Sequence, residues 1–294
     1  MFVQTNSIKA IRSYFKEKLS DLFSDSEIKI IGNEVICSRL NFSSNDLISA
    51  NDNLLSESDL LYFRSIVKRL LNHEPFQYVV GNTHFYGLVL KTDKRALIPR
   101  PETEELVDWI KEFYSIEKPS KIADICTGSG CIALSLKSIF KDSFIVATDY
   151  SQDALALTKE NSIDLKLDVK IVEFDARIED QFERLSFNDN TRYDCWVSNP
   201  PYIPNKEMSL MSENVLKFEP HLALFVSDID PLLFYRVISK KANDFLKKSG
   251  LLFFEIHEDL SNDVVQLLES LNYINIEVKK DLQGKNRMVK AEKL

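Results

Sequence analysis

The stretch IADICTGSGCIALSL, from Ile122 to Leu136, decides the fold class of this chain. Its first residues, through Cys126, are apolar around a single carboxylate and predict a buried strand. Residues Thr127 to Gly130 predict a turn, and the apolar run from Cys131 to Ile139 predicts a helix. Because glycines in the turn would let a ligand approach the backbone closely, the stretch indicates an α/β fold with a ligand at this loop.

The spacing within this loop argues against two common nucleotide sites. A pyrophosphate site requires G-x-G-x-x-G, but Cys126 stands at the first glycine position and no third glycine follows. A Walker lysine is also absent, which argues against nucleotide hydrolysis. Since a cysteine disfavours positive φ angles, we expect the turn to be made with a negative φ at Cys126.

Strands and helices alternate through the rest of the chain, which predicts a parallel sheet covered by helices on both faces. After the first strand, the expected strands are 144–149, 169–174, 193–198, 251–256, 273–278 and 288–291, the last of them antiparallel. The expected helices are 131–139, 154–161, 231–246 and 260–271.

The first quarter of the chain has a purely helical pattern. Apolar residues recur at steps of three and four from Ile8 to Leu22, and Ser56 to Asp59 resembles a capping box before a second apolar face. We therefore expect a small helical bundle over residues 1–75.

A short segment of aromatic and β-branched residues follows the bundle. These residues run from Gln77 to Val80 and from Phe85 to Leu90, on either side of a Gly-Asn pair. The pattern predicts a β-hairpin linker over residues 76–95. The α/β domain would then span residues 96–294.

Polar residues stand at the ends of the expected parallel strands: Asp124, Asp149, Asp175 and Asn199. Ligands of such sheets bind beyond the carboxyl ends of the strands, so we expect these side chains to converge on one crevice. Asp149 could accept both hydroxyls of a ribose, and Asp175 could accept from the amine of adenine. Each acid alone could equally be a solvated side chain. Together with a loop that lacks the pyrophosphate spacing, they indicate S-adenosylmethionine as the cofactor.

The motif Asn199-Pro200-Pro201-Tyr202 follows one of these strands. Two prolines fix the backbone and hold the carbonyl groups of Asn199 and Pro200 outward, although a Pro-Pro pair can also simply end a strand. The side-chain carbonyl of Asn199 and the backbone carbonyl of Pro200 could accept both N–H groups of a planar nitrogen, which would orient its lone pair for methylation. Tyr202 could offer a ring face to the planar group or to a sulfonium cation.

Composition limits the classes of function. The chain has 294 residues and a net charge of −8, without the basic surplus of a protein that grips nucleic acid. It contains no apolar run long enough for a membrane span, and its N-terminus lacks a secretory pattern. Its four cysteines show no metal-binding spacing. We expect a cytoplasmic monomer that binds no metal, no membrane and no nucleic acid.

With these motifs in view, the chain resembles the peptide chain release factor N5-glutamine methyltransferases over essentially its whole length. The stretches that carry the resemblance are ALIPRPETEELV (Ala96 to Val107), DICTGSGCIALSL (Asp124 to Leu136), ATDYSQDALALTKEN (Ala147 to Asn161), VSNPPYI (Val197 to Ile203) and FEPHLAL (Phe218 to Leu224). The resemblance implies a Rossmann-like class I S-adenosylmethionine-dependent methyltransferase domain, an N-terminal helical bundle that recognises the substrate, and a hairpin linker. It implies as substrate the glutamine of the Gly-Gly-Gln motif in bacterial class I release factors.

Residue by residue, the resemblance and the motifs assign candidate roles. The candidate cofactor residues are Asp124, Cys126, Thr127, Gly128, Ser129, Gly130, Asp149, Asp175, Ala176 and Asn199. The candidate substrate residues are Arg100, Glu102, Asn199, Pro200, Pro201 and Tyr202, and among them Asn199, Pro200 and Tyr202 are the candidate catalytic residues. Ala176 departs from the family, which often has a bulky aromatic residue there, so adenine packing would differ.

Two alternative functions remain open at this point. The N-P-P-Y motif is shared with adenine and guanine N-methyltransferases, although R-P-E-T-E and F-E-P are more specific to the release factor family. Cys126 in the glycine loop leaves room for a catalytically silent protein that only binds the cofactor.

Overall fold

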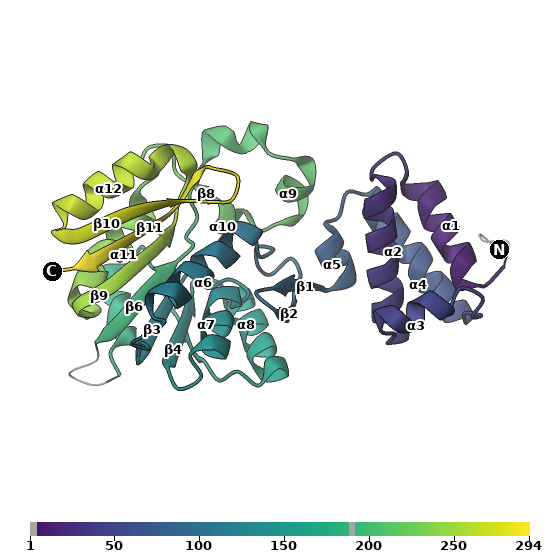
Figure 1. Ribbon diagram of the computed structural model, residues 1–294. Helices are drawn as coiled ribbons and strands as arrows, with labels where there is room; N and C mark the ends of the chain where they lie inside the picture. Colours follow the sequence, from purple (N-terminus) through teal and green to yellow (C-terminus); the bar gives the residue numbers. More distant parts are fainter. Residues whose placement is uncertain (1–4, 188–191) are drawn as a thin grey trace. The chain divides into compact units, whose positions relative to one another are not determined.

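The computed structural model describes residues 5–187 and 192–294, and the chain divides into two units (Figure 1). The first unit comprises Met1–Asn82 and Ser212–Phe218, and the second comprises Thr83–Met211 and Glu219–Leu294. Within the described ranges, no helix is both long and apolar enough to cross a membrane.

The first unit is a helical bundle, as the apolar spacing predicts. Its helices are α1 (Ile8–Leu19), α2 (Asp25–Leu40), α3 (Ser44–Ser49), α4 (Glu57–Leu71), α5 (Phe76–Val80) and α9 (Glu213–Phe218). Ser56 caps α4 through the predicted capping box. Phe15 and Phe63 are fully buried where α1 and α4 pack against each other. Leu22 lies outside this core and is 39% exposed, because α1 ends before it.

The segment from Gln77 to Val80, predicted as the first hairpin strand, is instead part of the short helix α5. Pro75 precedes this helix and Gly81 ends it in the left-handed conformation, with a φ of 84°. These terminal signals, together with burial of Val79 in the helical core, outweigh the β propensity of the segment.

A hairpin does follow α5, but it is shorter than predicted. It consists of β1 (Asn82–Phe85) and β2 (Leu88–Lys91). Its two turn residues, Tyr86 and Gly87, both have positive φ angles, 47° and 76°. This is the backbone of a type I′ turn, whose twist matches that of the paired strands.

The second unit is built on a seven-stranded sheet in the order β10-β11-β9-β6-β3-β4-β5. The strands are β3 (Lys121–Ile125), β4 (Phe144–Asp149), β5 (Lys170–Glu173), β6 (Tyr193–Ser198), β9 (Leu246–Glu255), β10 (Tyr273–Lys280) and β11 (Asn286–Lys293). Strands β5, β4, β3, β6 and β9 pair in parallel, and β11 pairs antiparallel with both β9 and β10. The predicted parallel sheet with an antiparallel last strand is thus confirmed.

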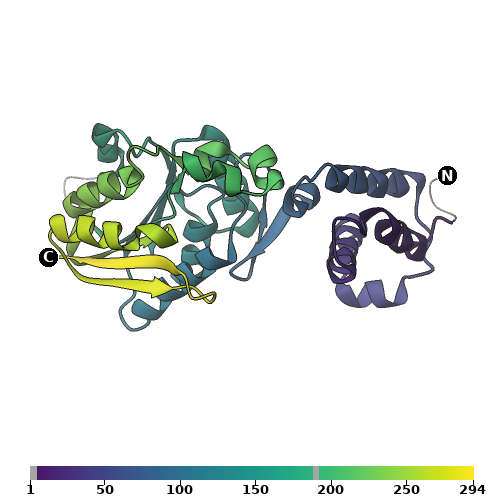
Figure 2. The ribbon, with the colours of Figure 1, turned by 90° about the horizontal axis from the view of Figure 1, so that it is seen from above.

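Helices cover both faces of this sheet (Figures 1 and 2). They are α6 (Pro101–Phe113), α7 (Cys131–Ile139), α8 (Gln152–Leu165), α11 (Leu233–Phe245) and α12 (Ser261–Ser270). Successive residues of a strand enter opposite cores: Trp196 packs in the core beneath α11 and α12, and Val197 packs in the core beneath α6 and α7. The chain thus buries apolar runs on both faces, which leaves the strand ends for polar groups.

Short elements complete the second unit. The structure contains β7 (Ile203–Pro204), β8 (Phe225–Val226) and α10 (His221–Leu224), together with 3-10 turns at Glu179–Leu185, Asn205–Leu210 and Glu258–Leu260. Strands β7 and β8 pair in parallel, so they hold the segment after the N-P-P-Y motif beside the segment after F-E-P.

Candidate active site

A pocket opens at the carboxyl ends of β3, β4 and β6 in the second unit. Its volume is about 1020 Å³ when the open mouth is included, and small-molecule sites in proteins typically occupy roughly 300–1000 Å³. The candidate residues that line it are Arg100, Cys126, Thr127, Gly128, Ser129, Asp149, Asp175, Ala176, Asn199 and Pro201. Those that do not line it are Glu102, Asp124, Gly130, Pro200 and Tyr202.

Cys126 adopts a positive φ of 63°, so the expectation of a negative φ is wrong. The chain reverses direction as it leaves β3, and the N–H of Thr127 donates to the carbonyl of Thr148 on β4 at 2.8 Å. This bond ties the turn to the neighbouring strand. It keeps Cys126 in a left-handed conformation that costs a residue with a Cβ about 1–2 kcal/mol.

The two glycines of the loop have different tasks. A Cβ on Gly130 would come within 2.8 Å of the Thr158 side chain, so this glycine permits close packing against α8. A Cβ on Gly128 would meet no heavy atom within 4 Å, and Gly128 lines the pocket. The backbone at Gly128 is therefore open to a ligand, whereas Gly130 serves the fold.

Asp124, expected among the cofactor residues, lies behind the loop and is fully buried. Its Oδ2 accepts from the hydroxyl of Thr127 at 2.6 Å and from the N–H of Ala133 at 3.1 Å. Burial raises the pKa of Asp124 to about 7. Asp124 therefore holds the loop onto the start of α7 and does not face the pocket.

Asp149 lines the pocket at the end of β4. Its Oδ2 accepts from the N–H of Gly128 at 2.9 Å, and its Oδ1 accepts from the N–H of Ser151 at 2.9 Å. Each carboxylate oxygen keeps one lone pair for another donor. Burial raises the pKa of Asp149. The carboxylate is thus fixed in place with acceptors left for a ligand.

Asp175 and Ala176 also line the pocket, but Asp175 is held by a residue that sequence reasoning missed. Arg177 donates from Nε to Oδ1 at 2.8 Å, from Nη2 to Oδ2 at 2.6 Å and from its backbone N–H to Oδ1 at 2.9 Å. The guanidinium holds the pKa of Asp175 below its usual range and lies 5.1 Å from the centre of the Tyr150 ring. Nε also lies 3.1 Å from Oδ2, so both carboxylate oxygens of Asp175 already accept from Arg177.

Asn199 lies at the pocket wall and joins a chain of hydrogen bonds behind it. Its Nδ2 donates to Oγ1 of Thr103 at 3.3 Å, and that hydroxyl donates to Oε2 of Glu255 at 2.6 Å. The hydroxyl of Tyr202 donates to Oε1 of Glu255 at 3.0 Å. Tyr202, expected to turn a ring face toward the ligand, is therefore tied to this buried carboxylate, with its ring at an edge-to-face angle to His257.

Arg100 lines the pocket and is fixed by a second buried carboxylate. Its Nη2 lies 2.6 Å from Oε1 of Glu219, and Oε2 of Glu219 accepts from the N–H of Ile98 at 3.1 Å. Glu219 is only 4% exposed. Glu102, in contrast, accepts from the side chain of Gln283 at 3.2 Å and does not line the pocket.

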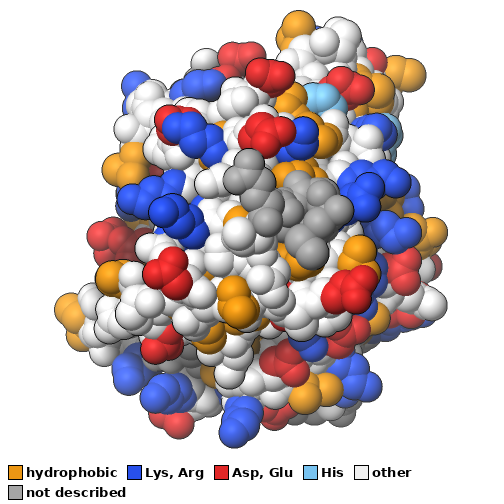
Figure 3. Space-filling view, turned by 90° about the vertical axis from the view of Figure 1, so that its right-hand side faces the viewer, with side chains coloured by type: hydrophobic (Ala, Val, Ile, Leu, Met, Phe, Trp, Pro, Cys, Tyr) orange, Lys and Arg blue, Asp and Glu red, His pale blue; other side chains and the backbone are white. Residues whose placement is uncertain are grey.

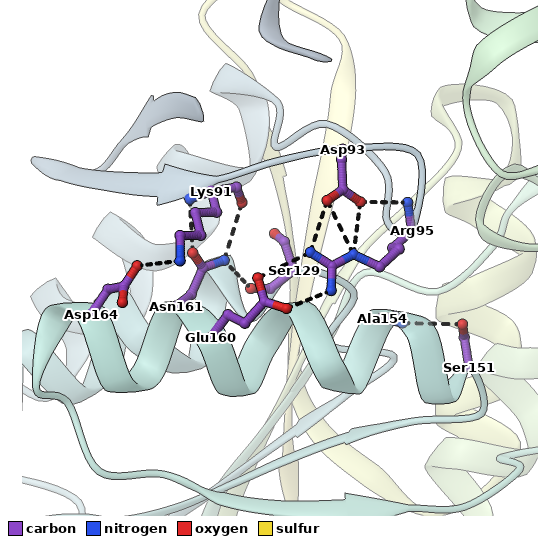
Figure 4. Close-up of polar contacts among 9 residues, drawn as sticks. All are labelled: Lys91, Asp93, Arg95, Ser129, Ser151, Ala154, Glu160, Asn161 and Asp164. Carbon is purple, nitrogen blue, oxygen red and sulfur yellow. Dashed lines mark hydrogen bonds and ion pairs between the residues drawn. The ribbon is translucent and has the colours of Figure 1, made fainter. Parts of the chain in front are cut away.

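The segment between β2 and α6 is clasped onto α8 at the edge of the pocket (Figure 4). Asn161 accepts from the N–H of Lys91 at 2.7 Å and donates to the carbonyl of Ser129 at 3.0 Å. Arg95, which lines the pocket, lies between Asp93 at 2.8 Å and Glu160 at 2.7 Å. The clasp thus joins the segment to both α8 and the glycine loop.

Sequence reasoning missed four residues that organise this site: Thr103, Arg177, Glu219 and Glu255. Glu255 carries the same signal as Asp149, a carboxylate that ends an apolar strand, and that rule could have found it. Thr103 and Glu219 stand inside the R-P-E-T-E and F-E-P stretches. No local signal marks Arg177, because its partner and its ring contact become visible only in the fold.

The residues that line the pocket fit the adenosine part of S-adenosylmethionine. Asp149 offers free acceptors, the backbone at Gly128 is open to a ligand, and Ala176 leaves room where a larger side chain would stand. Among the residues that the structure describes, no cluster of His, Cys, Asp and Glu side chains could hold a metal ion.

Comparison with known proteins finds relatives that match almost the whole chain. Residues 104–222 match the family described as "Methyltransferase small domain", and residues 13–81 match "PrmC N-terminal domain". A relative from Flavobacterium psychrophilum, named "Release factor glutamine methyltransferase", is 40% identical over 97% of this chain and 98% of its own length. One of the same name from Bacteroides thetaiotaomicron is 36% identical over 96% of this chain and 99% of its own length.

A solved structure has the same fold at low identity. "Crystal structure of Methyltransferase from Pyrococcus furiosus" is 16% identical, covers 81% of this chain and 97% of its own, and gives a TM-score of 0.51. The fold therefore agrees with the methyltransferase domain match, and the full-length similarity defines the family. The chain belongs to the release factor glutamine methyltransferase family.

Proposed function

We propose that this chain methylates the side-chain amide nitrogen (N5) of the glutamine in the Gly-Gly-Gln motif of bacterial class I peptide chain release factors. Support comes from relatives named for release factor glutamine methylation that match nearly the whole chain. The observation that carries the chemistry is Asn199 at the pocket wall, with its Nδ2 engaged by Thr103 and its Oδ1 left to accept.

The cofactor that fits the pocket is S-adenosylmethionine, which supplies a methyl group activated by a sulfonium cation. Asp149 would hold the ribose hydroxyls with the lone pairs that Gly128 and Ser151 leave free. The exposed backbone at Gly128 would admit the ligand closely. Asp175 and Ala176 would border the adenine.

The protein's contribution to the reaction is positioning and electrostatics. An amide nitrogen is a weak nucleophile because its lone pair is delocalised into the carbonyl group. The Oδ1 of Asn199 and the carbonyl oxygen of Pro200 would accept its two N–H groups and direct the lone pair out of the amide plane. The same two oxygens would stabilise positive charge as it develops on the nitrogen. No general base is required beforehand, since the proton becomes acidic only when the nitrogen gains charge.

The structure changes the roles proposed for two other candidates. The hydroxyl of Tyr202 is tied to Glu255, so we propose that Tyr202 shapes the motif from behind instead of offering a ring face. The carboxylate of Glu102 accepts from the side chain of Gln283, so we propose no contact between Glu102 and the glutamine.

Methylation of a purified class I release factor tests the proposal directly. The wild-type chain and labelled S-adenosylmethionine should add one methyl group to the Gly-Gly-Gln peptide, detected by mass spectrometry, and a Gly-Gly-Glu release factor should remain unmodified. Asn199→Ala should abolish turnover while cofactor affinity, measured by calorimetry, stays within a few fold. Undiminished turnover would refute the role of Asn199, and cofactor binding without any methylation would favour a silent binding protein.

A nucleic-acid N-methyltransferase is the rival within enzymes. The chain carries a net charge of −8, and Figure 3 shows acidic and basic side chains interspersed over the face that it presents. A protein that binds a phosphate backbone gains most of its affinity from clustered basic groups. Labelled methyl groups in DNA or ribosomal RNA, but not in the release factor, would establish the rival. We further propose a monomer in the cytoplasm, which sedimentation and fractionation would test.

A further inference from the structure

We propose that Thr103 and Glu255 are positioning residues that fix the amide of Asn199 in the one orientation that presents Oδ1 to the substrate nitrogen. This inference rests on the proposed function, because it concerns the group that would hold the glutamine. It assigns a role to a buried carboxylate that the methyl-transfer chemistry itself does not use.

The residues come from three elements that meet only in the fold. Asn199 follows β6, Thr103 lies in the first turn of α6, and Glu255 is the last residue of β9. Thr103 is 2% exposed and Glu255 is 1% exposed. The hydroxyl of Thr103 lies 2.6 Å from Glu255 and 3.3 Å from Nδ2 of Asn199. Asn199 and Thr103 both line the pocket, whereas Glu255 lies behind them.

The number of available protons sets the direction of each hydrogen bond between Glu255, Thr103 and Asn199. Burial raises the pKa of Glu255, while the hydrogen bonds from Thr103 and Tyr202 act to lower it. In its ionised form Glu255 only accepts hydrogen bonds, so it takes the single hydroxyl proton of Thr103. The oxygen of Thr103 can then only accept from Asn199, and Nδ2 is the only donor on that side chain. A flipped amide would set Oδ1 against the lone pairs of Thr103, and the loss of this hydrogen bond would disfavour the flip roughly tenfold.

The groups that donate hydrogen bonds to Glu255 are hydroxyl groups. Tyr202 donates to its other oxygen at 3.0 Å. Within the described residues no Lys, Arg or His nitrogen is within salt-bridge distance of Glu255. Arg287 pairs with Asp281 at 3.2 Å and acts on Glu255 only through its charge at longer range. Glu102 adds a like charge nearby. A carboxylate buried without a directly paired cation is costly, and an apolar residue would serve packing better.

The orientation of the amide matters because the second acceptor cannot move. The carbonyl of Pro200 is part of a backbone fixed between two prolines. Both N–H groups of the glutamine are satisfied only if Asn199 presents its oxygen. If the amide of Asn199 were flipped, its NH2 group would face an N–H group of the glutamine. Only the carbonyl of Pro200 would then remain as an acceptor.

A matched pair of variants tests this role. Thr103→Val keeps the shape but removes the hydroxyl, and Thr103→Ser keeps the hydroxyl but removes a methyl group. Thr103→Val should lower kcat for release factor methylation about tenfold, with the Kd for S-adenosylmethionine changed less than twofold, while Thr103→Ser should keep kcat within twofold of wild type. A merely structural role would move stability and cofactor affinity, not kcat of the folded enzyme.

A second pair covers the case in which Thr103→Val does not fold. In Asn199→Asp, two carboxylates compete for the one proton of Thr103, so turnover should fall at least a hundredfold. In the double variant Asn199→Asp with Glu255→Gln, the new amide at position 255 can donate a hydrogen bond to the oxygen of Thr103. The hydroxyl of Thr103 is then free to donate to the new carboxylate at position 199, so turnover should recover at least tenfold.

The outcomes separate this inference from the proposed function. A wild-type chain that does not methylate the release factor overturns the proposed function. If the wild type is active, equal kcat for folded Thr103→Val and Thr103→Ser overturns the inference alone. If Thr103→Val does not fold, equal turnover of the single and double variants at positions 199 and 255 overturns it.

Discussion

Replacing Asp124 by Asn should change how the stability of the second unit depends on pH. Asp124 is fully buried, and burial raises its pKa from 3.8 to about 7. The folded chain therefore holds a proton on Asp124 that the unfolded chain has released between these two values. The contribution of Asp124 to the free energy of unfolding is fully present below pH 3.8 and is lost as the pH rises through about 7.

The size of the effect follows from the two pKa values. Each pH unit over which the folded chain binds one extra proton lowers the free energy of unfolding by about 1.4 kcal/mol. Between pH 5.5 and pH 8.5, the wild type should lose about 2 kcal/mol relative to Asp124→Asn, with nearly all of the loss below pH 7.5. The prediction concerns how the difference in the free energy of unfolding changes with pH, and not its absolute size. The absolute size also depends on the new amide, whose NH2 group can stand at the position of Oδ1, a buried oxygen that has no hydrogen-bond partner in the described structure.

Urea unfolding followed by tryptophan fluorescence measures this difference in the relevant unit. Both tryptophans, Trp109 and Trp196, lie in the second unit. Asp93→Asn is the matched control. Arg95 holds the pKa of Asp93 below its ordinary value, so this side chain is ionised in both states and its difference from wild type should stay flat. A flat difference for Asp124→Asn would refute the buried, protonated carboxyl group.

Two further predictions concern the loop and the cofactor. Asp149→Ala should weaken S-adenosylmethionine binding by about 1–3 kcal/mol, the cost of leaving hydroxyl partners unmet. Calorimetry would measure it, and Asp124→Asn, which lies behind the loop, should keep the Kd within a few fold; equal affinities for both variants would contradict the roles assigned to these acids. Cys126→Gly should be about 1 kcal/mol more stable than Cys126→Ala in urea unfolding, because only Ala carries the left-handed strain. A glycine variant less stable than the alanine variant would indicate a negative φ in solution.

The sequence predicts regular elements well where one interaction dominates. The strand from Tyr193 to Ser198 is buried on both faces, and its bounds agree with the structure because an apolar run between breakers leaves few alternatives. The segment from Gln77 to Val80 has strand-forming residues, yet it forms a helix because its ends and its burial favour one. Local propensity is a weak term there, and packing decides.

Cys126 shows a different limit of sequence reasoning. Its preference for negative φ is real, but it amounts to about 1–2 kcal/mol. The geometry of the turn is set by the bond from Thr127 to Thr148 on the next strand. A preference of one residue cannot overturn a turn on which two strands depend, and the sequence does not contain the register of those strands.

Among the strand-end acids, burial separates those that hold the fold from the one that we propose for the ligand. Asp124 and Glu255 are 0% and 1% exposed, and their partners belong to the chain itself. Asp149 lines the pocket and keeps acceptors free. All three satisfy the same sequence rule, a carboxylate at the end of an apolar strand. The rule therefore locates the active edge of the sheet, but only the direction of each side chain tells which acids bind the ligand and which orient the residues that do.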